Sequence, residues 1–332
     1  MTFKLTVHGL IQNLLIFVWV LQSAVAMAAA RPVFSLGQFQ TDTGAITILN
    51  KGDTTDPYFA MQALLLAHDN GLDTTAAAEK FANWLVGRQK PDGTFDRFCL
   101  NATGVWISCK TADADDSLLA LWMRLLETMP KQLSKNAGWT KSHAASKKAL
   151  EHLYQPSRGI YMVSPVYLHG LFMDNLEVWS LKAHSGETKS AGLDKLAKAI
   201  YQTFWQQASS SFLVSTQLEQ QTQKPQFYPD HVAQIFPLLV DFPLLPQSSK
   251  IYYQNWMRMH RGEWLRQGET DYPWGILAVL ALRQGDEQSA RCWLRETTAM
   301  RYSSRWAVTD EAAFLILTSG RIQAANKTAN CN

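Results

Sequence analysis

Aspartates recur along this chain at the start of its apolar segments. Six such segments begin at Asp56, Asp116, Asp174, Asp230, Asp271 and Asp310, with intervals long enough for two helices and their loops. Carboxyl groups brought together can do general acid–base chemistry, because one can hold a proton while a neighbour stays ionised. The spacing therefore predicts an acidic site assembled from several elements.

Aspartate is also among the best helix N-caps, because its carboxylate accepts a backbone N–H and complements the helix dipole. For any single aspartate, capping is the stronger interpretation. For Asp271 we favour it further, because Pro273 occupies an early helical position. Asp310 and Glu311 complete the set with lower priority. Six caps on parallel helices would still form an acidic rim.

The elements that position these aspartates are helices. Apolar residues repeat at i, i+3, i+4 and i+7 throughout, and few stretches alternate as strands do, so we expect an all-α chain. Residues 31–55 are polar and fit an arm or a short strand pair. Breakers such as Asn70-Gly71 and Pro91-Asp92-Gly93 separate the helices. The expected helices are 57–70, 75–89, 115–129, 140–153, 173–185, 189–208, 229–240, 249–260, 272–284, 286–301 and 309–319.

These helices alternate between two kinds. Those that begin with the aspartates are apolar and aromatic, whereas the intervening ones carry Lys, Gln and Ser on one face. An apolar helix is buried on most sides and an amphipathic helix buries one stripe. The alternation predicts an inner ring wrapped by an outer ring, an (α/α)6 toroid of helical hairpins. We expect a single domain over residues 31–320 and a polar tail over 321–332.

Residues 1–30 have the features of a secretory signal peptide. Lys4 is followed by the apolar run 14–21 and by small residues suited to cleavage near Ala26. An uncleaved signal anchor and a buried helix are the alternatives. No later stretch approaches the ~20 apolar residues that a span needs, so we expect an exported, periplasmic or secreted protein without a stable membrane span after cleavage.

The four cysteines fit an oxidising compartment. Cys99 and Cys109 flank a short polar loop, and a disulfide there is the expected pairing, contributing about 2–3 kcal/mol by loop entropy. Two free thiols are the alternative. Cys292 lies in a helical pattern and Cys331 in the tail, and the sequence assigns neither a role.

Composition and motifs exclude several classes of protein. The net charge is +3, with both signs scattered, so we expect no nucleic-acid partner. The sequence has no CxxC or HExxH, and its eight histidines are dispersed, so we expect no metal. GxGxxG, GxxxxGK[ST] and GxSxG are also absent, so no cofactor is expected.

Several segments resemble a known group of enzymes. The segment 111–120, TADADDSLLA, resembles the Asp-Ala-Asp signature of glycoside hydrolase family 8, which cleaves β-1,4-linked polysaccharides on an (α/α)6 barrel. The segments 55–60 (TDPYFA), 173–178 (MDNLEV) and 227–234 (FYPDHVAQ) are similar to bacterial members of the six-hairpin glycosidase superfamily. The resemblance implies a hydrolase acting on a polysaccharide.

The resemblance carries over only in part. Family 8 enzymes place a general-acid glutamate just before the first inner helix, where this chain has Asp53-Thr-Thr-Asp56. Asp56 is the implied replacement, with a shorter reach. The sugar-binding carboxylate falls on Asp116, or on Asp115 with a one-residue slip; we favour Asp116 because Ala120 then keeps its interval. Asp113 opens the same segment and is an expected substrate contact.

Two further carboxylates complete the predicted acid and base. Glu177 lies one turn deeper than Asp174 on the same helix face, which makes it a candidate acid if Asp56 only caps. A pairing of Glu177 with Arg or Lys is the alternative. Asp230 begins the fourth inner helix on the opposite side of the toroid, where a base is expected.

Aromatic side chains near the aspartates are expected to stack on sugar rings. Trp122 and Trp179 lie inside helices and are expected in the core instead. The expected binding residues, with Asp113 and Asp174, are Tyr58, Trp106, Tyr228, Tyr272, Trp274 and Trp306.

The sequence thus predicts an exported glycosidase that cleaves a bacterial exopolysaccharide or another β-linked glycan, with Asp56, Asp116, Glu177 and Asp230 as its working carboxylates. Glycoside hydrolysis needs one protonated and one ionised carboxyl group. A polysaccharide lyase, supported by Tyr228, His231 and Arg305, is one alternative. The other is a glycan-binding subunit of polysaccharide biosynthesis or export machinery, because the acid glutamate is missing.

Overall fold

The computed structural model describes residues 31–185, 191–320, 322–326 and 330–331. The described residues from Val33 onward form one compact unit. The expected signal peptide, residues 1–30, lies outside the described residues.

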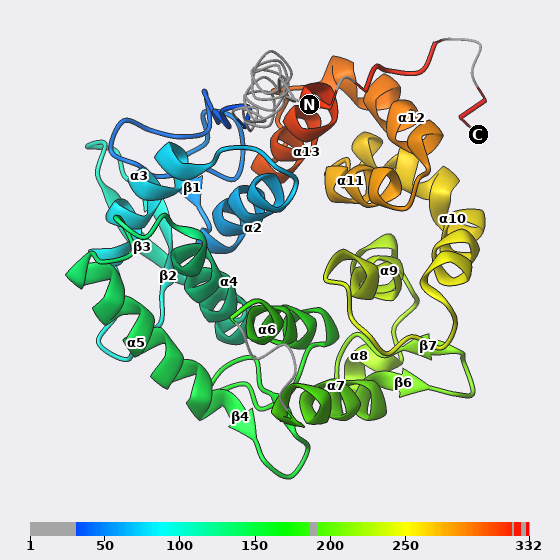
Figure 1. Cartoon of the computed structure of the whole chain (residues 1–332), viewed down its shortest axis with the longest axis horizontal. Coiled ribbons are helices and arrows are strands. Elements are labelled where there is room, and N and C mark those ends of the chain that lie inside the picture. Colours follow the sequence, from blue (N-terminus) through cyan, green and yellow to red (C-terminus); the bar gives the residue numbers. More distant parts are fainter. Residues whose placement is uncertain (1–30, 186–190, 321, 327–329, 332) are drawn as a thin grey trace, which may run out of the picture. The chain divides into compact units, whose positions relative to one another are not determined.

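The unit is mostly helical and barrel-like (Figure 1). Its central helices are α2 (Pro57–Asp69), α4 (Asp115–Thr128), α6 (Phe172–His184), α9 (Val232–Leu239), α11 (Gly275–Arg283) and α13 (Val308–Ser319). They alternate along the chain with peripheral helices α3 (Thr75–Val86), α5 (Ala137–Leu153), α7 (Ala191–Phe204), α10 (Ser249–Leu265) and α12 (Glu287–Thr297).

The central helices contact one another in sequence order. α2 packs against α4, α4 against α6, and α6 against α9. Arg283 at the end of α11 donates to the carbonyl of Leu239 at the end of α9, 3.0 Å away. α11 packs against α13, and α13 returns to α2, so the first and last central helices are neighbours.

Residue type explains which helices lie inside. The central helix α11 reads GILAVLALR and buries residues around its whole circumference, whereas α12, EQSARCWLRET, buries one stripe. Large rings fill the space around the central helices. Trp122, Trp264, Trp293 and Trp306 are all fully buried. The expected core position of Trp122 is confirmed.

A small sheet replaces the polar loop expected between the second and third helices. β1 (Thr54–Thr55), β2 (Asp96–Leu100) and β3 (Trp106–Thr111) form an antiparallel sheet in that order. The predicted disulfide is confirmed: Cys99 and Cys109 join β2 to β3 with their Cα atoms 5.7 Å apart. Two short hairpins follow, β4–β5 (Tyr154–Gln155 and Ile160–Tyr161) and β6–β7 (Trp205–Gln206 and Ser211–Phe212).

Some helices end or begin away from their predicted bounds, for local reasons. α7 ends at Phe204 rather than at 208, because Trp205 pairs with Phe212 in a hairpin. The expected helix 229–240 starts as a π-helical turn, η1 (Phe227–His231), before α9. α11 starts at Gly275 rather than at 272, because Trp274 adopts a left-handed backbone, φ 55°.

Short helical turns lie in the remaining connections. They are α8 (Leu218–Gln221), η2 (Gln267–Glu269) and η3 (Thr298–Met300).

The tail is attached to the periphery of the unit. Cys292 on α12 forms a disulfide with Cys331, a pairing that the sequence left unassigned. Arg261 on α10 donates to the carbonyl of Cys331, 2.8 Å away. None of the helices formed by the described residues combines the length and apolar character needed to cross a bilayer.

Candidate active site

Three carboxyl groups are buried together where α4 and α6 begin. Asp116 is the second residue of α4, and Asp174 and Glu177 lie one turn apart on α6. Their exposed fractions are 0% for Asp116, 9% for Asp174 and 5% for Glu177. α4 and α6 are packed neighbours, so the turn that begins each helix delivers its acids to one place. We call these residues the acid cluster.

Burial raises the pKa of every acid in the cluster. Burial, followed by the charge of Asp174, raises the pKa of Asp116 well above its usual value. Burial raises the pKa of Asp174 to about 7, although its hydrogen bond with Asp116 lowers it. Burial, then the charge of Asp174, also raises the pKa of Glu177. Both side-chain oxygens of Asp116 and Oδ2 of Asp174 are buried, which disfavours the ionised form of either acid.

Tyr58 on α2 orients the glutamate of the cluster. Its hydroxyl donates to Glu177 Oε1 at 2.8 Å and accepts from Gln62 Nε2 at 3.1 Å. The alternative of a pairing between Glu177 and Arg or Lys is not what the structure shows; the phenol of Tyr58 is its hydrogen-bond partner. Tyr58 therefore joins a third central helix to the acid cluster.

A second pair of carboxylates shares one cation. Arg97 on β2 donates through Nε to Asp56 Oδ2 at 2.6 Å, and through Nη2 to Asp113. Asp56 also caps α2, since its Oδ1 accepts the backbone N–H of Tyr58 at 3.0 Å. Burial raises the pKa of Asp56, against the opposing charge of Arg97. Asp113 lies on the rim, with 68% of its side chain exposed.

Arg97 was not identified from the sequence. It comes beside Asp56 because β1 pairs with β2, placing Thr55 opposite Phe98. The polar composition of residues 96–111 gave no signal of this strand register. Gln62, which donates to the Tyr58 hydroxyl, was also missed, because in the sequence it looks like any other helix residue.

Aromatic rings border the acid cluster. Tyr228 stacks on Trp274 with centroids 5.0 Å apart and an interplanar angle of 28°, and half of Tyr228 is exposed. Burial of its hydroxyl, then the charges of Asp174 and Glu177, raise the pKa of Tyr228 to about 12, which places it beside the cluster. Tyr272 packs edge-on against Phe59, and Phe59 against Tyr58.

Three other predicted residues have partners outside the acid cluster. Asp230 Oδ2 accepts the backbone N–H of Gln226 at 2.9 Å, so its carboxylate stabilises its own turn. Trp306 is fully buried and donates to Glu311 Oε2, so its ring is closed to a saccharide. Trp106 is half-buried on β3, edge-on to Trp84. No contact among the described residues joins these three to the acid cluster.

The remaining aspartates have structural partners. Asp271 does not cap a helix; its Oδ2 accepts from the indole of Trp274 at 3.4 Å. Asp310 accepts the backbone N–H groups of Gly275 at 2.7 Å and Ala307 at 3.2 Å. Burial raises the pKa of Asp310 to about 7.

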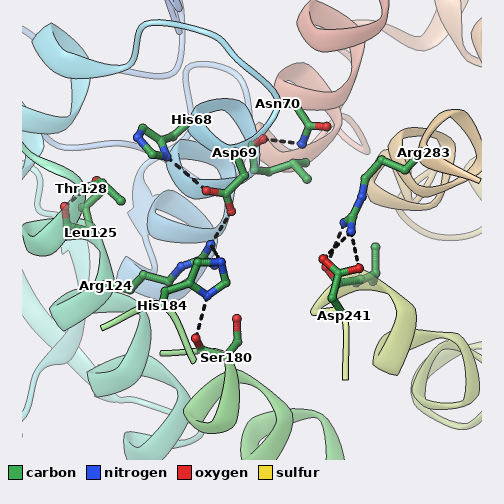
Figure 2. A network of polar contacts seen from close by, with 12 residues as sticks. His68, Asp69, Asn70, Arg124, Leu125, Thr128, Ser180, His184, Asp241 and Arg283 are labelled. Atoms are coloured by element: carbon green, nitrogen blue, oxygen red, sulfur yellow. Dashed lines mark hydrogen bonds and ion pairs between the residues drawn. The ribbon is translucent and has the colours of Figure 1, made fainter. Parts of the chain in front are cut away.

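A pocket of about 80 Å³ runs between the central helices from Glu177 towards their carboxyl ends. Figure 2 shows the ion pairs at that end: Arg124 with Asp69 at 2.6 Å, and Arg283 with Asp241 at 2.6 Å. One water needs at least roughly 10–15 Å³ of such space, so the pocket suits a few waters and is too small for a sugar ring. At the opposite end of these helices, Asp113 and Tyr228 are exposed.

The helical barrel is shared with a solved structure. The chain superposes on an α-amylase from Clostridium perfringens with a TM-score of 0.55 and 8% identity, covering 84% of this chain and 93% of that one. A D-mannose isomerase matches with a TM-score of 0.39 and 12% identity over 85% and 80% of the two chains, too weakly to add to the fold assignment. No family model and no curated protein sequence matches the chain.

Proposed function

We propose that this protein is an exported glycoside hydrolase built on a six-hairpin (α/α)6 toroid. The observation that carries the proposal is the buried acid cluster beside two carboxylates held by Arg97. The resemblance of the Asp-Ala-Asp segment to glycoside hydrolase family 8 supports it, as does the barrel shared with an enzyme described as an α-amylase. The two disulfides support export.

The two groups of carboxyls differ in the way that glycoside hydrolysis requires. A general acid must carry a proton near neutral pH, whereas the second carboxylate must be ionised. Asp174 fits the acid, because its pKa of about 7 keeps it partly protonated and it is the most exposed member of the cluster. Burial and the charge of Asp113 favour its protonated form, against the hydrogen bond with Asp116.

Asp113 fits the ionised partner. Its carboxylate is exposed and lies within ion-pair distance of Arg97 and Lys110, and its charge raises the pKa of Asp174. Asp56 is bound to both Arg97 and the start of α2, which suits a positioning role. Asp230 was the base expected from the sequence, and we prefer Asp113 because it is coupled to the cluster.

The aromatic residues supply a surface for the sugar. The exposed face of Tyr228, backed by Trp274, is suited to stacking on the apolar face of a pyranose. Tyr272 and Tyr58 extend the aromatic surface beside the acids. We therefore propose a polysaccharide or oligosaccharide substrate.

The test is hydrolysis of a panel of polysaccharides, measured by the release of reducing ends. The panel contains β-1,4-glucans, chitosan, α-glucans and bacterial exopolysaccharides. We expect D174N and D113N to fold and to lose at least about a hundredfold in rate, the lower end for acid–base catalysis. D230N is the matched control and should stay active. Full hydrolytic activity in D174N would refute the proposed site. If D230N loses activity while D113N keeps it, Asp230 is the base and Asp113 is not.

The same panel separates two other functions. Products absorbing as unsaturated uronates would identify a lyase, although a Tyr228 pKa of about 12 disfavours its use as a base. Binding of an oligosaccharide without turnover would identify a glycan-binding subunit of an export system. One structural observation favours that outcome. Asp56 stands in the place of the family's acid glutamate, and its carboxylate accepts a hydrogen bond from Arg97.

A further inference from the structure

Two histidines and a glutamate converge on the side of the unit where η1 meets α10. His231 ends η1, while His260 and Glu263 lie one turn apart on α10. His231 Nδ1 is 3.0 Å from Glu263 Oε2, and His260 Nδ1 is 3.8 Å from the same oxygen. The three potential ligand atoms all lie within 4.8 Å of one another.

This spacing matches the coordination sphere of a small transition cation. Two ligands bound at about 2.0–2.1 Å to a tetrahedral Zn²⁺ lie about 3.4 Å apart, between the two observed separations. Two imidazoles and one carboxylate form a common zinc ligand set. We propose that His231, His260 and Glu263 bind a divalent transition cation, with Zn²⁺ as the natural candidate, and leave the fourth position to water.

Trp256 contacts both histidines of the proposed site. Trp256 donates its indole N–H to the carbonyl of His231 at 2.7 Å and lies 5.4 Å from the His260 ring. All four cysteines are in disulfides and do not compete for the cation.

An ordinary histidine–glutamate pair would not have this arrangement. His143 and Glu127 form such a pair elsewhere, at 2.9 Å and with similar exposure. What distinguishes the proposed site is the second imidazole, whose ring centroid is 4.0 Å from that of His231. Two imidazoles and a carboxylate around one point suit a shared cation better than a single hydrogen bond.

The cation would join two elements. His231 belongs to the segment Phe227–His231, which also carries Tyr228, whereas the other two ligands belong to the peripheral helix α10. Binding would fix this segment to α10 and stabilise the folded unit. The site is independent of the glycosidase proposal, because its ligands are distinct from the acid cluster.

The experiment uses the mature protein without a polyhistidine tag, stripped with EDTA and dialysed. Titration with Zn²⁺ in a calorimeter should show one site. A hundredfold excess over Kd should raise Tm by about 4 °C. Co²⁺ in the same site should give the intense visible absorption of a four-coordinate centre.

Two variants and one control make the test decisive. H260A and E263Q should each weaken Zn²⁺ binding by more than about tenfold, the least that even an outer-shell change costs, while H143A should bind as the wild type does. E263Q preserves shape, so loss of binding there does not reflect misfolding. The proposal is overturned if the wild type takes up no Zn²⁺ or Co²⁺, or if H260A and E263Q bind both as the wild type does.

Discussion

At the scale of single residues, the acid cluster carries a cost in stability. Asp116, Asp174 and Glu177 are buried, and the described residues place no cation in contact with any of them. Burying a carboxyl without a partner disfavours its ionised form, so folding and ionisation oppose each other here. Such strain is common where a site is arranged for catalysis.

Replacing one acid of the cluster should therefore stabilise the protein. Asp174 has a pKa of about 7 when folded against 3.8 ordinarily, so at pH 8 the folded state bears an ionisation cost that an amide does not. We expect D174N to raise the free energy of unfolding at pH 8 on the order of 2 kcal/mol. Urea unfolding followed by circular dichroism measures it.

Asp69 provides a control of opposite sign. Burial opposes its ionisation, but the hydrogen bond from His68 and the charge of Arg124 outweigh burial and lower its pKa. D69N should therefore be less stable than wild type at pH 8. If D174N loses stability as D69N does, the cluster is not strained as described.

The residues of the site were predictable to different degrees. The spacing of Asp174 and Glu177 placed both on one face of a helix, and the structure agrees. The partners of Asp56 and Glu177 were not predictable, because Arg97 arrives through strand register and Tyr58 through the packing of α2 near α6. Long-range contacts of this kind leave no pattern in local sequence.

At the scale of elements, the six aspartates do not all cap helices as their positions suggested. Asp56 caps α2, but Asp116 and Asp174 lie inside the first turns of α4 and α6. Asp310 serves two helices, since it accepts N–H groups at the starts of both α11 and α13. The apolar pattern indicated that α11 and α13 exist, but it could not show that one carboxylate would join the starts of both.

Loss of this double cap should cost more than loss of an ordinary one. An N-cap substitution by alanine costs about 1 kcal/mol, and D310A removes two buried acceptors, so we expect about 2–3 kcal/mol. Asn136, which caps α5 alone by accepting from Gly138 and Trp139, is the matched control. Chemical unfolding of D310A and N136A compares them; equal losses would contradict the shared role of Asp310.

At the scale of the whole molecule, charges are arranged differently at the two ends of the central helices. At one end lies the acid cluster, where burial raises the pKa of Asp174. At the other end lie the ion pairs in Figure 2. The sequence predicted the inner and outer helices closely, because apolar and amphipathic patterns differ. The hairpins and the disulfide between Cys292 and Cys331 were not predicted, since they depend on partners distant in the sequence.

This arrangement determines how stability should depend on pH. Asp174 and Asp310 have pKa values of about 7 and Asp115 of about 6, all above 3.8, so the folded state binds more protons than the unfolded chain between pH 4 and 7. Their contribution is present in acid and is lost as pH rises through 7. We expect Tm to be higher at pH 5 than at pH 8.

Differential scanning calorimetry from pH 5 to 8 measures this dependence. D174N should flatten the curve, whereas D113N, on the rim, should leave most of it unchanged. A Tm that rises steadily towards pH 8 in the wild type would contradict the assignment of protons to these aspartates.

The contact between α2 and α13 has a consequence for the order of events in folding. α2 comes first among the central helices and α13 comes last, yet each buries a face against the other. A ribosome adds about 5–20 residues per second, so α2 is complete tens of seconds before its final neighbour exists. Closure of the barrel is therefore a late, post-synthetic step, and a chain lacking α13 would leave the apolar face of α2 open to chaperones and proteases.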